Sequence, residues 1–338
     1  MAGYGLHMVK CPGDGPDVTE KGEGGKSVRF THWMRPNGAY SILFLVLVLP
    51  SLIFAQAPAD ESKKGGIDYS FSLTPVLQFS APVDGGGTLS VFRNFFGADA
   101  TVPVNQSFRL GFGLSYDFQN YNFSGLERFI VPEPWNRIHR LGVGASFFYK
   151  MSERWTLFVG PTAEFSAEEG ADWGTALNYG GIFSLSYSTG PGLTIGAGLG
   201  MFSGLAQNAA FPYLVISWKI TDRLRLSNPF QAGPAGPAGL ELAYTLDKNW
   251  EIATGGAYRS FRFRLDENGP IPNGIGEESL YPAYLRLSRA LGPGMTISLY
   301  GGAALAGKLT LQNKRGHDID GANYDAAPLI ALSISGKF

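Results

Sequence analysis

The chain ends, over residues 329–338, with the stretch LIALSISGKF. Apolar side chains fall on every second place, at Ile330, Leu332 and Ile334, and the last residue is Phe338. A period of two predicts a β-strand with one apolar face and one polar or small face. The apolar face of such a strand can meet either a protein core or the lipid of a membrane, so the rest of the chain must decide between them.

The composition favours a lipid-facing β-structure. Of the 338 residues only 16% are charged, whereas soluble domains have about 25%, and there are 46 glycines and 13% aromatic residues. The formal net charge is −1 and no basic run is present, which argues against nucleic acid as a partner. A secreted all-β domain is the alternative that composition alone leaves open.

The N-terminal part predicts export. Arg35 precedes an apolar segment of about 16 residues, and Ala55 and Ala57 offer cleavage sites, so residues 34–57 are expected to be a signal peptide. Residues 1–33 have no structural pattern, and we expect them to be an upstream extension before the true start at Met34. Residues 58–66 are expected to be a flexible lead-in. The single cysteine, Cys11, lies before the signal, which excludes a disulfide scaffold in the exported chain.

Strand-like alternation recurs from residue 67 to the end. Residues 107–338 contain twelve such runs, residues 67–80 add one, and the stretch 88–96 adds a weaker one that Arg93 and Asn94 interrupt. Runs of about ten alternating residues suit tilted membrane-spanning strands. The sequence therefore predicts an all-β, antiparallel up-and-down transmembrane barrel over residues 67–338, with fourteen strands, or twelve as the alternative.

The connections between these runs alternate in length. The short ones are turn-rich, at 152–154, 189–192, 221–223, 247–249 and 291–294. The long ones lie near 121–137, 166–174, 204–211, 231–238, 265–279 and 312–326. Short periplasmic turns and longer external loops are the layout of outer-membrane barrels, and all the short turns fall on one side.

The final strand resembles the C-terminal signal by which the barrel assembly machinery of bacterial outer membranes recognises its substrates. Phe338, Ile334, Leu332 and Ile330 match that signal, while Gly336 stands at one alternate place. Residues 67–338 are also similar in layout to a bacterial family of unknown function that is predicted to form outer-membrane barrels. The resemblance implies a location in a Gram-negative outer membrane, with lipid, lipopolysaccharide and the assembly machinery as partners. It implies no activity, and it leaves the oligomeric state open.

The polar face of the strands carries more basic than acidic residues. By alternation it includes Arg109, Arg140, Lys219, Arg223, Arg225, Arg262, Arg264 and Arg286, against Asp68, Asp117, Glu164 and Glu241. A basic lumen would favour anions. The alternative is that arginines and acids pair and fill the lumen.

Motifs for catalysis, cofactors or metals do not stand out. His139 and His317 are the only histidines after the signal, and neither a G-x-S-x-G nor an H-E-x-x-H pattern is present. The acidic stretch around His317 and Asp320 fits a solvated loop better than a cation or lipopolysaccharide site. The glycines at 196, 198 and 200 predict an inner wall without bulk or a curved strand.

These observations predict a narrow pore for small solutes, because fourteen strands fall between filled eight-stranded barrels and open channels of sixteen or more. The alternative is a closed barrel that acts through its external loops. A lipid-hydrolysing barrel is the third and least favoured hypothesis, and we expect no enzyme activity.

Overall fold

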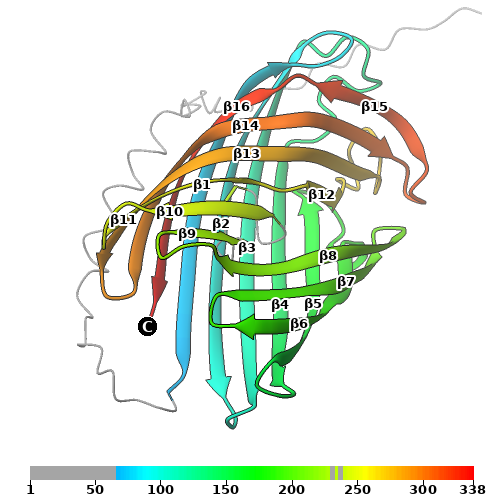
Figure 1. The fold of residues 1–338 in the computed structure, drawn as a ribbon. Helices are drawn as coiled ribbons and strands as arrows, with labels where there is room; N and C mark the ends of the chain where they lie inside the picture. Colours follow the sequence, from blue (N-terminus) through cyan, green and yellow to red (C-terminus); the bar gives the residue numbers. More distant parts are fainter. Residues whose placement is uncertain (1–65, 229–232, 235–238) are drawn as a thin grey trace, which may run out of the picture. The chain divides into compact units, whose positions relative to one another are not determined.

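The computed structural model describes residues 66–228, 233–234 and 239–338 (Figure 1). These residues belong to one compact unit, Ala59–Phe338. The predicted signal peptide, the segment before it and residues 58–65 of the lead-in lie outside the described residues.

The described chain is built from antiparallel strands. In the first half these are β1 (Asp68–Pro82), β2 (Thr88–Pro103), β3 (Phe108–Ser124), β4 (Arg137–Lys150), β5 (Trp155–Glu168), β6 (Leu177–Gly190), β7 (Leu193–Gly204) and β8 (Gln207–Lys219). In the second half they are β9 (Leu224–Ser227), β10 (Leu240–Thr245), β11 (Trp250–Gly256), β12 (Arg259–Arg264), β13 (Ile275–Gly292), β14 (Met295–Gln312), β15 (Asp318–Tyr324) and β16 (Ala327–Lys337). A 3-10 turn, η2 (Trp173–Thr175), lies between β5 and β6.

The segments form a closed barrel of fourteen strands. β11 and β12 pair with β13 in one register and make one interrupted strand, because Pro282 of β13 lies opposite the break and cannot donate a hydrogen bond. β15 and β16 pair with successive parts of β14 in the same way. β16 pairs with β1, for example Gly336 with Phe71, and this closes the ring. The prediction of fourteen strands, including the weak one at 88–96, is confirmed.

The two ends of the barrel differ. One end, which we call the turn end, has short connections at 104–107, 151–154, 191–192, 220–223, 246–249 and 293–294. The other, the loop end, has those at 83–87, 125–136, 169–176, 205–206, 228–239, 265–274 and 313–317. All five predicted short turns lie at the turn end.

Several of the predicted long loops are shorter than expected, and residues 121–124 of the first one belong to β3. The loop expected at 204–211 is a two-residue turn, because Leu205 and Ala206 both adopt positive φ (48° and 58°), as a tight hairpin requires. Within the region 312–326, residues 318–324 form the strand β15, and residues 275–279 belong to β13. Polar composition alone did not reveal these strand extensions.

The predicted alternation is confirmed, and its apolar face lies outside the ring. The outward side chains include Phe112, Leu114, Leu141, Val143, Phe183, Leu185, Leu199, Met201, Leu285, Leu299 and Leu332, all more than a third exposed. In β16 Ile330 and Leu332 are exposed, whereas Ser333 and Ser335 are buried. The turn end also carries a girdle of exposed outward aromatic residues, Tyr69, Tyr149, Trp155, Trp218 and Phe338.

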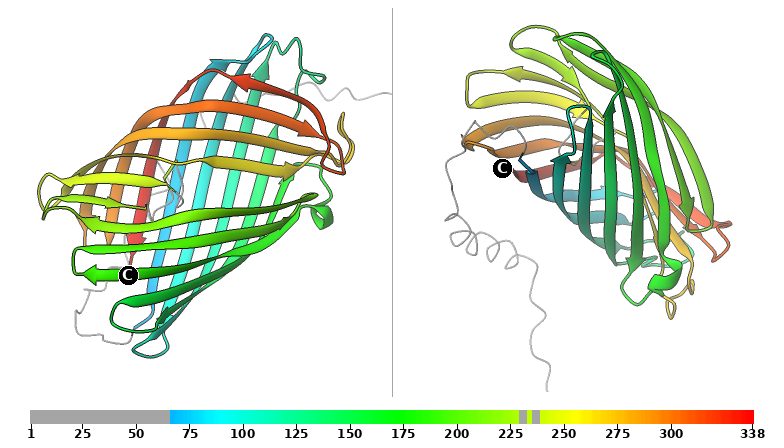
Figure 2. Two further views of the ribbon diagram at one scale, coloured as in Figure 1. Left: turned by 45° about the vertical axis from the view of Figure 1, so that its right-hand side comes forward. Right: turned by 90° about the horizontal axis from the view of Figure 1, so that it is seen from below.

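The loop end is narrower than the turn end. At this end Arg264 of β12 pairs with Ala167 of β5 in a parallel bridge. β5 and β12 are thus direct neighbours there, and the strands β6–β10 do not lie between them. β9 and β10 hold only four and six residues, against 13 in β8. Asn228 follows the last residue of β9 on the side of the loop end. Its side chain accepts a hydrogen bond from the backbone N–H of Ile216 and donates to the carbonyls of Leu214 and Gly239. Figure 2 shows the ring from two further sides.

Candidate functional site

The lumen is the candidate functional site, and its two halves differ in chemistry. Toward the turn end the inward positions carry small hydroxyl side chains, with buried members Ser184, Ser227, Ser288, Ser298, Ser333 and Ser335. Some of them bond one another, as in Thr74–Ser333 and Ser288–Ser298, both at 2.8 Å. Small polar side chains leave room inside a ring of this size.

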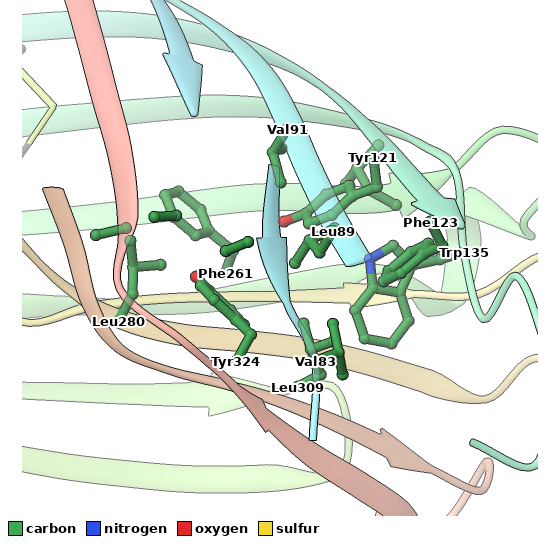
Figure 3. Close-up of a cluster of buried hydrophobic side chains, with 14 of the residues drawn as sticks. Val83, Leu89, Val91, Tyr121, Phe123, Trp135, Phe261, Leu280, Leu309 and Tyr324 are labelled. Atoms are coloured by element: carbon green, nitrogen blue, oxygen red, sulfur yellow. The ribbon is translucent and has the colours of Figure 1, made fainter. Parts of the chain in front are cut away.

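Toward the loop end the lumen is filled with apolar side chains. Leu89, Phe263 and Trp135 are at most 2% exposed and belong to one contiguous cluster with Tyr121 and Phe123 (Figure 3). The ring of Trp135 meets those of Phe263 and Phe123 edge to face, at centroid distances of 5.3 and 5.6 Å. The described residues therefore close this half of the barrel by packing.

A buried ion pair lies beneath this cluster. The guanidinium of Arg93 on β2 bonds the carboxylate of Glu278 on β13, and both residues are at most 3% exposed. Arg93 also donates to Gln78 (2.8 Å) and Gln119 (3.3 Å). The hydroxyls of Tyr121 and Tyr324 each donate to Glu278 at 2.7 Å. The pair thus ties four strands, β1, β2, β3 and β13, and a fifth segment, β15, together across the lumen.

One step nearer the turn end lies a second charged group. Arg140 is paired with Asp117 (2.9 Å) and Glu164 (3.3 Å). Arg259 lies over the rings of Phe95 and Phe261, 5.5 and 4.9 Å from their centroids, which is the geometry of a cation–π contact. These side chains form the floor of the polar half.

A pocket of about 340 Å³ opens in the wall made by β9–β14. At its base Arg286 bonds both oxygens of Glu241 (2.6 and 3.0 Å) and one oxygen of Glu251 (2.8 Å). Tyr284 also donates to Glu241, at 3.0 Å. Arg225 reaches Glu251 only at 3.4 Å, and both of these side chains are partly exposed.

The structure separates the six side chains predicted to line the lumen. Arg140, Glu164 and Arg286 lie inside it. Arg109 lies at the rim of the turn end, half-exposed and paired with Asp68 at 2.7 Å. The other two, on β12, belong to the narrowed loop end.

Those two arginines hold β12 to neighbouring loops. Arg262 pairs with Glu277 (2.8 Å) and donates to the carbonyl of Leu205 (2.9 Å). Arg264 donates twice to the carbonyl of Thr175, at 3.0 and 3.1 Å. Among the basic residues assigned to the polar face, Lys219 is paired with Asp222 in a turn. That contact holds the pKa of the Asp222 carboxyl below its ordinary value.

Sequence reasoning missed Arg93, Glu278, Glu251 and Arg259. Arg93 appeared to interrupt a lipid-facing strand, whereas it points inward between the inward side chains of Val91 and Phe95. Glu278 and Glu251 lie on inward positions by strand pairing, so a full parity count of both charges would have found them.

The pairing of the final strand with β1 explains why a glycine stands at position 336. A β-carbon at Gly336 would collide with the ring of Phe71, which lies directly opposite it on β1. Phe338 stacks on the same ring at 6.0 Å. Gly198 and Gly200, predicted to form a wall without bulk, are likewise covered by Tyr213 and Phe211 of β8.

The acidic loop region has structural contacts. Asp320 accepts a bond from the backbone of Ile130 (2.6 Å), and Asp318 from Gln312 (2.7 Å). Within the described ranges, no three histidine, cysteine or acidic residues gather as metal ligands would. Nor does any helix there have the length and apolarity to cross a membrane.

Comparison with known proteins places the sequence in a family. Residues 103–319 match the family described as domain of unknown function DUF6268. The chain belongs to this family. A comparison with curated proteins finds no match.

Solved structures with a similar arrangement are bacterial barrels. The COG4313 outer membrane channel from Pseudomonas putida F1 has a TM-score of 0.45 and 10% identity, over 84% of this chain and all of the other. The toluene transporter TodX of P. putida has a TM-score of 0.38 and 12% identity, over 83% and 90%. The NanC porin has a TM-score of 0.35 and 10% identity, over 79% and 100%. These values are too low to transfer a function.

Proposed function

We propose that this protein is a pore-forming barrel of a Gram-negative outer membrane, with its turn end in the periplasm and a closed state at its loop end. The membrane location is supported by the outward apolar face and the aromatic girdle, which water would solvate poorly. Binding of the refolded barrel to phospholipid vesicles tests this part. A barrel that stays folded and monomeric in plain buffer would contradict it.

The pore assignment rests on the contrast between the two halves of the lumen. A purely structural barrel needs no cavity, yet the polar half here contains a pocket of about 340 Å³ below a packed cluster. Small polar solutes would enter from the periplasm and reach the floor formed by Arg140 and Arg259. Passage to the outside requires the apolar cluster to rearrange.

Planar-bilayer recording with cysteine labelling tests the pore. We expect rare openings of small conductance from the unmodified barrel. Ser115 lies on the inward face of β3, nearer the turn end than Asp117. Ser115→Cys should react with a charged thiol reagent added on the periplasmic side. Val91→Cys, in the packed half, should react only during openings. The absence of conductance from well-folded protein, together with an unreactive Ser115→Cys, would refute the proposal.

The packed loop end favours a second candidate, a closed barrel that acts through its external loops. Its signature would be a cellular phenotype that is lost when the loop 125–136 is shortened, while conductance and folding stay unchanged. Contacts of the loop end with lipopolysaccharide would belong to this function.

The anion preference remains a prediction. Four of the five arginines predicted to line the lumen have a carboxylate partner, which argues for weak anion selectivity. Arg259, which lies over aromatic rings, adds a cation at the floor and argues for anion preference. The reversal potential in a potassium chloride gradient measures it. Recognition of Phe338 by the assembly machinery is a further proposal, and deletion of this residue should reduce the amount of assembled barrel.

A further inference from the structure

The pocket between β9 and β14 has the properties of a ligand site. Its wall combines hydroxyl and amide side chains with two buried rings, those of Tyr284 and Tyr300, which meet at 5.2 Å. Its volume, about 340 Å³, lies at the lower end of the range for small-molecule sites. It opens into the polar half of the lumen, so a solute in that half can reach it.

The charges around the pocket cancel. Its lining includes three basic side chains, Arg225, Lys248 and Arg286, and three acidic ones, Glu241, Asp247 and Glu251. Arg286 already donates to both glutamates and to Ser288. A charged ligand would add an unpaired charge to this balanced set, which is unfavourable where water is scarce.

The polar groups that remain available suit hydroxyl groups. Arg225 and Glu251 approach each other only to 3.4 Å and are partly exposed, so each can exchange this contact for a ligand hydroxyl. Thr245 and Thr296 add donors and acceptors to the wall. The two tyrosine rings offer an apolar surface for the C–H groups of a sugar ring.

We infer that this pocket binds a small neutral polyhydroxylated compound, such as a monosaccharide, in preference to an anion or a cation of the same size. The inference rests on the proposed function for access to the lumen, but binding itself does not require conduction.

The experiment measures binding to the folded barrel in detergent by saturation-transfer NMR, with D-glucose, D-glucuronate and D-glucosamine as ring-shaped probes of similar size. We expect glucose to bind best. The double substitution Arg225→Gln with Glu251→Gln keeps the net charge and should weaken glucose binding about tenfold. The matched control, Arg109→Gln with Asp68→Asn, removes an exposed pair outside the pocket and should leave binding unchanged.

A single substitution gives a signature that a structural role would not. Glu251→Gln leaves one excess positive charge and should shift the preference from glucose to glucuronate. Stronger binding of glucuronate or glucosamine to the unmodified barrel would overturn the inference, as would binding of none of the three. A barrel that binds glucose without conducting would contradict only the pore, and one that conducts without binding would contradict only this inference.

Discussion

The buried pair of Arg93 and Glu278 gives the sharpest test of how the lumen is closed. Glu278→Gln keeps the shape of the side chain and removes its charge. Arg93 would then have only the neutral acceptors of Gln78 and Gln119 around its guanidinium, at a site that is 3% exposed. Breaking one side of a buried pair costs about 3–5 kcal/mol, because the remaining charge is uncompensated.

Loss of the tyrosine bonds to residue 278 adds little to this cost, because the glutamine oxygen still accepts from Tyr121 or Tyr324. We therefore expect Glu278→Gln to lower the free energy of unfolding by about 3–5 kcal/mol. Arg93→Met should lower it less, because both tyrosine hydroxyls still stabilise the carboxylate. Combining the two removes both charges, and the double variant should recover about 2 kcal/mol relative to the sum of the single losses.

The assay is guanidinium-induced unfolding in phospholipid vesicles, followed by tryptophan fluorescence. The control pair, Arg109→Met and Asp68→Asn, is half-exposed at the rim and should show losses of at most about 1 kcal/mol. Single losses below about 1 kcal/mol for the buried pair, or losses that simply add in the double variant, would refute the reasoning. We also expect Glu278→Gln to open more often in bilayer recordings, since the same pair joins opposite walls.

Three further predictions concern other contacts. Gly336→Ala should hinder assembly because its methyl group meets the Phe71 ring, and adding Phe71→Ala should restore the yield of folded barrel measured by gel mobility; an unhindered single variant would contradict this. Arg264→Ala removes two bonds to Thr175 and should destabilise the loop end by about 1.5–3 kcal/mol, with faster proteolysis of 169–176, whereas Arg223→Ala should not. In an NMR titration the carboxyl of Asp222 should have a pKa below its ordinary 3.8, and Lys219→Gln should return this pKa to 3.8. An unchanged pKa in the variant would rule out the contact. Because the pKa is lowered in the folded state, the contact stabilises the fold only above this range, and the effect is lost as the pH falls through it.

The barrel could be predicted from the sequence because lipid imposes one rule on every strand. The alternation in β3, from Phe108 to Phe118, and in β16 persists wherever the inner face is polar. In β2 the rule fails, because Leu89, Val91 and Phe95 point into a packed interior while Phe92 and Phe96 point outward. Apolar residues on both faces erase the period of two there, and Arg93 then looks misplaced.

The site itself was only partly predictable. Parity places Arg140, Glu164 and Arg286 in the lumen, but it says nothing about which acid each arginine meets. Those pairings depend on the register between neighbouring strands, which places Asp117 of β3 opposite Arg140 of β4. The narrowing at β5 and β12 depends on the short β9 and β10, whose length is set by contacts such as those of Asn228 rather than by a periodic pattern.

The pairing of β1 with β16 has a consequence for biogenesis. On the edge that faces away from β2, residues 70–78 find their partners in residues 329–337, which lie far from them along the sequence. Until the last segment is delivered, β1 and β14 both keep unsatisfied amide and carbonyl groups, which hydrocarbon tolerates poorly. Closure of the barrel in lipid can therefore be completed only once β16 is in place, and the open edges of β1 and β14 must be shielded until then.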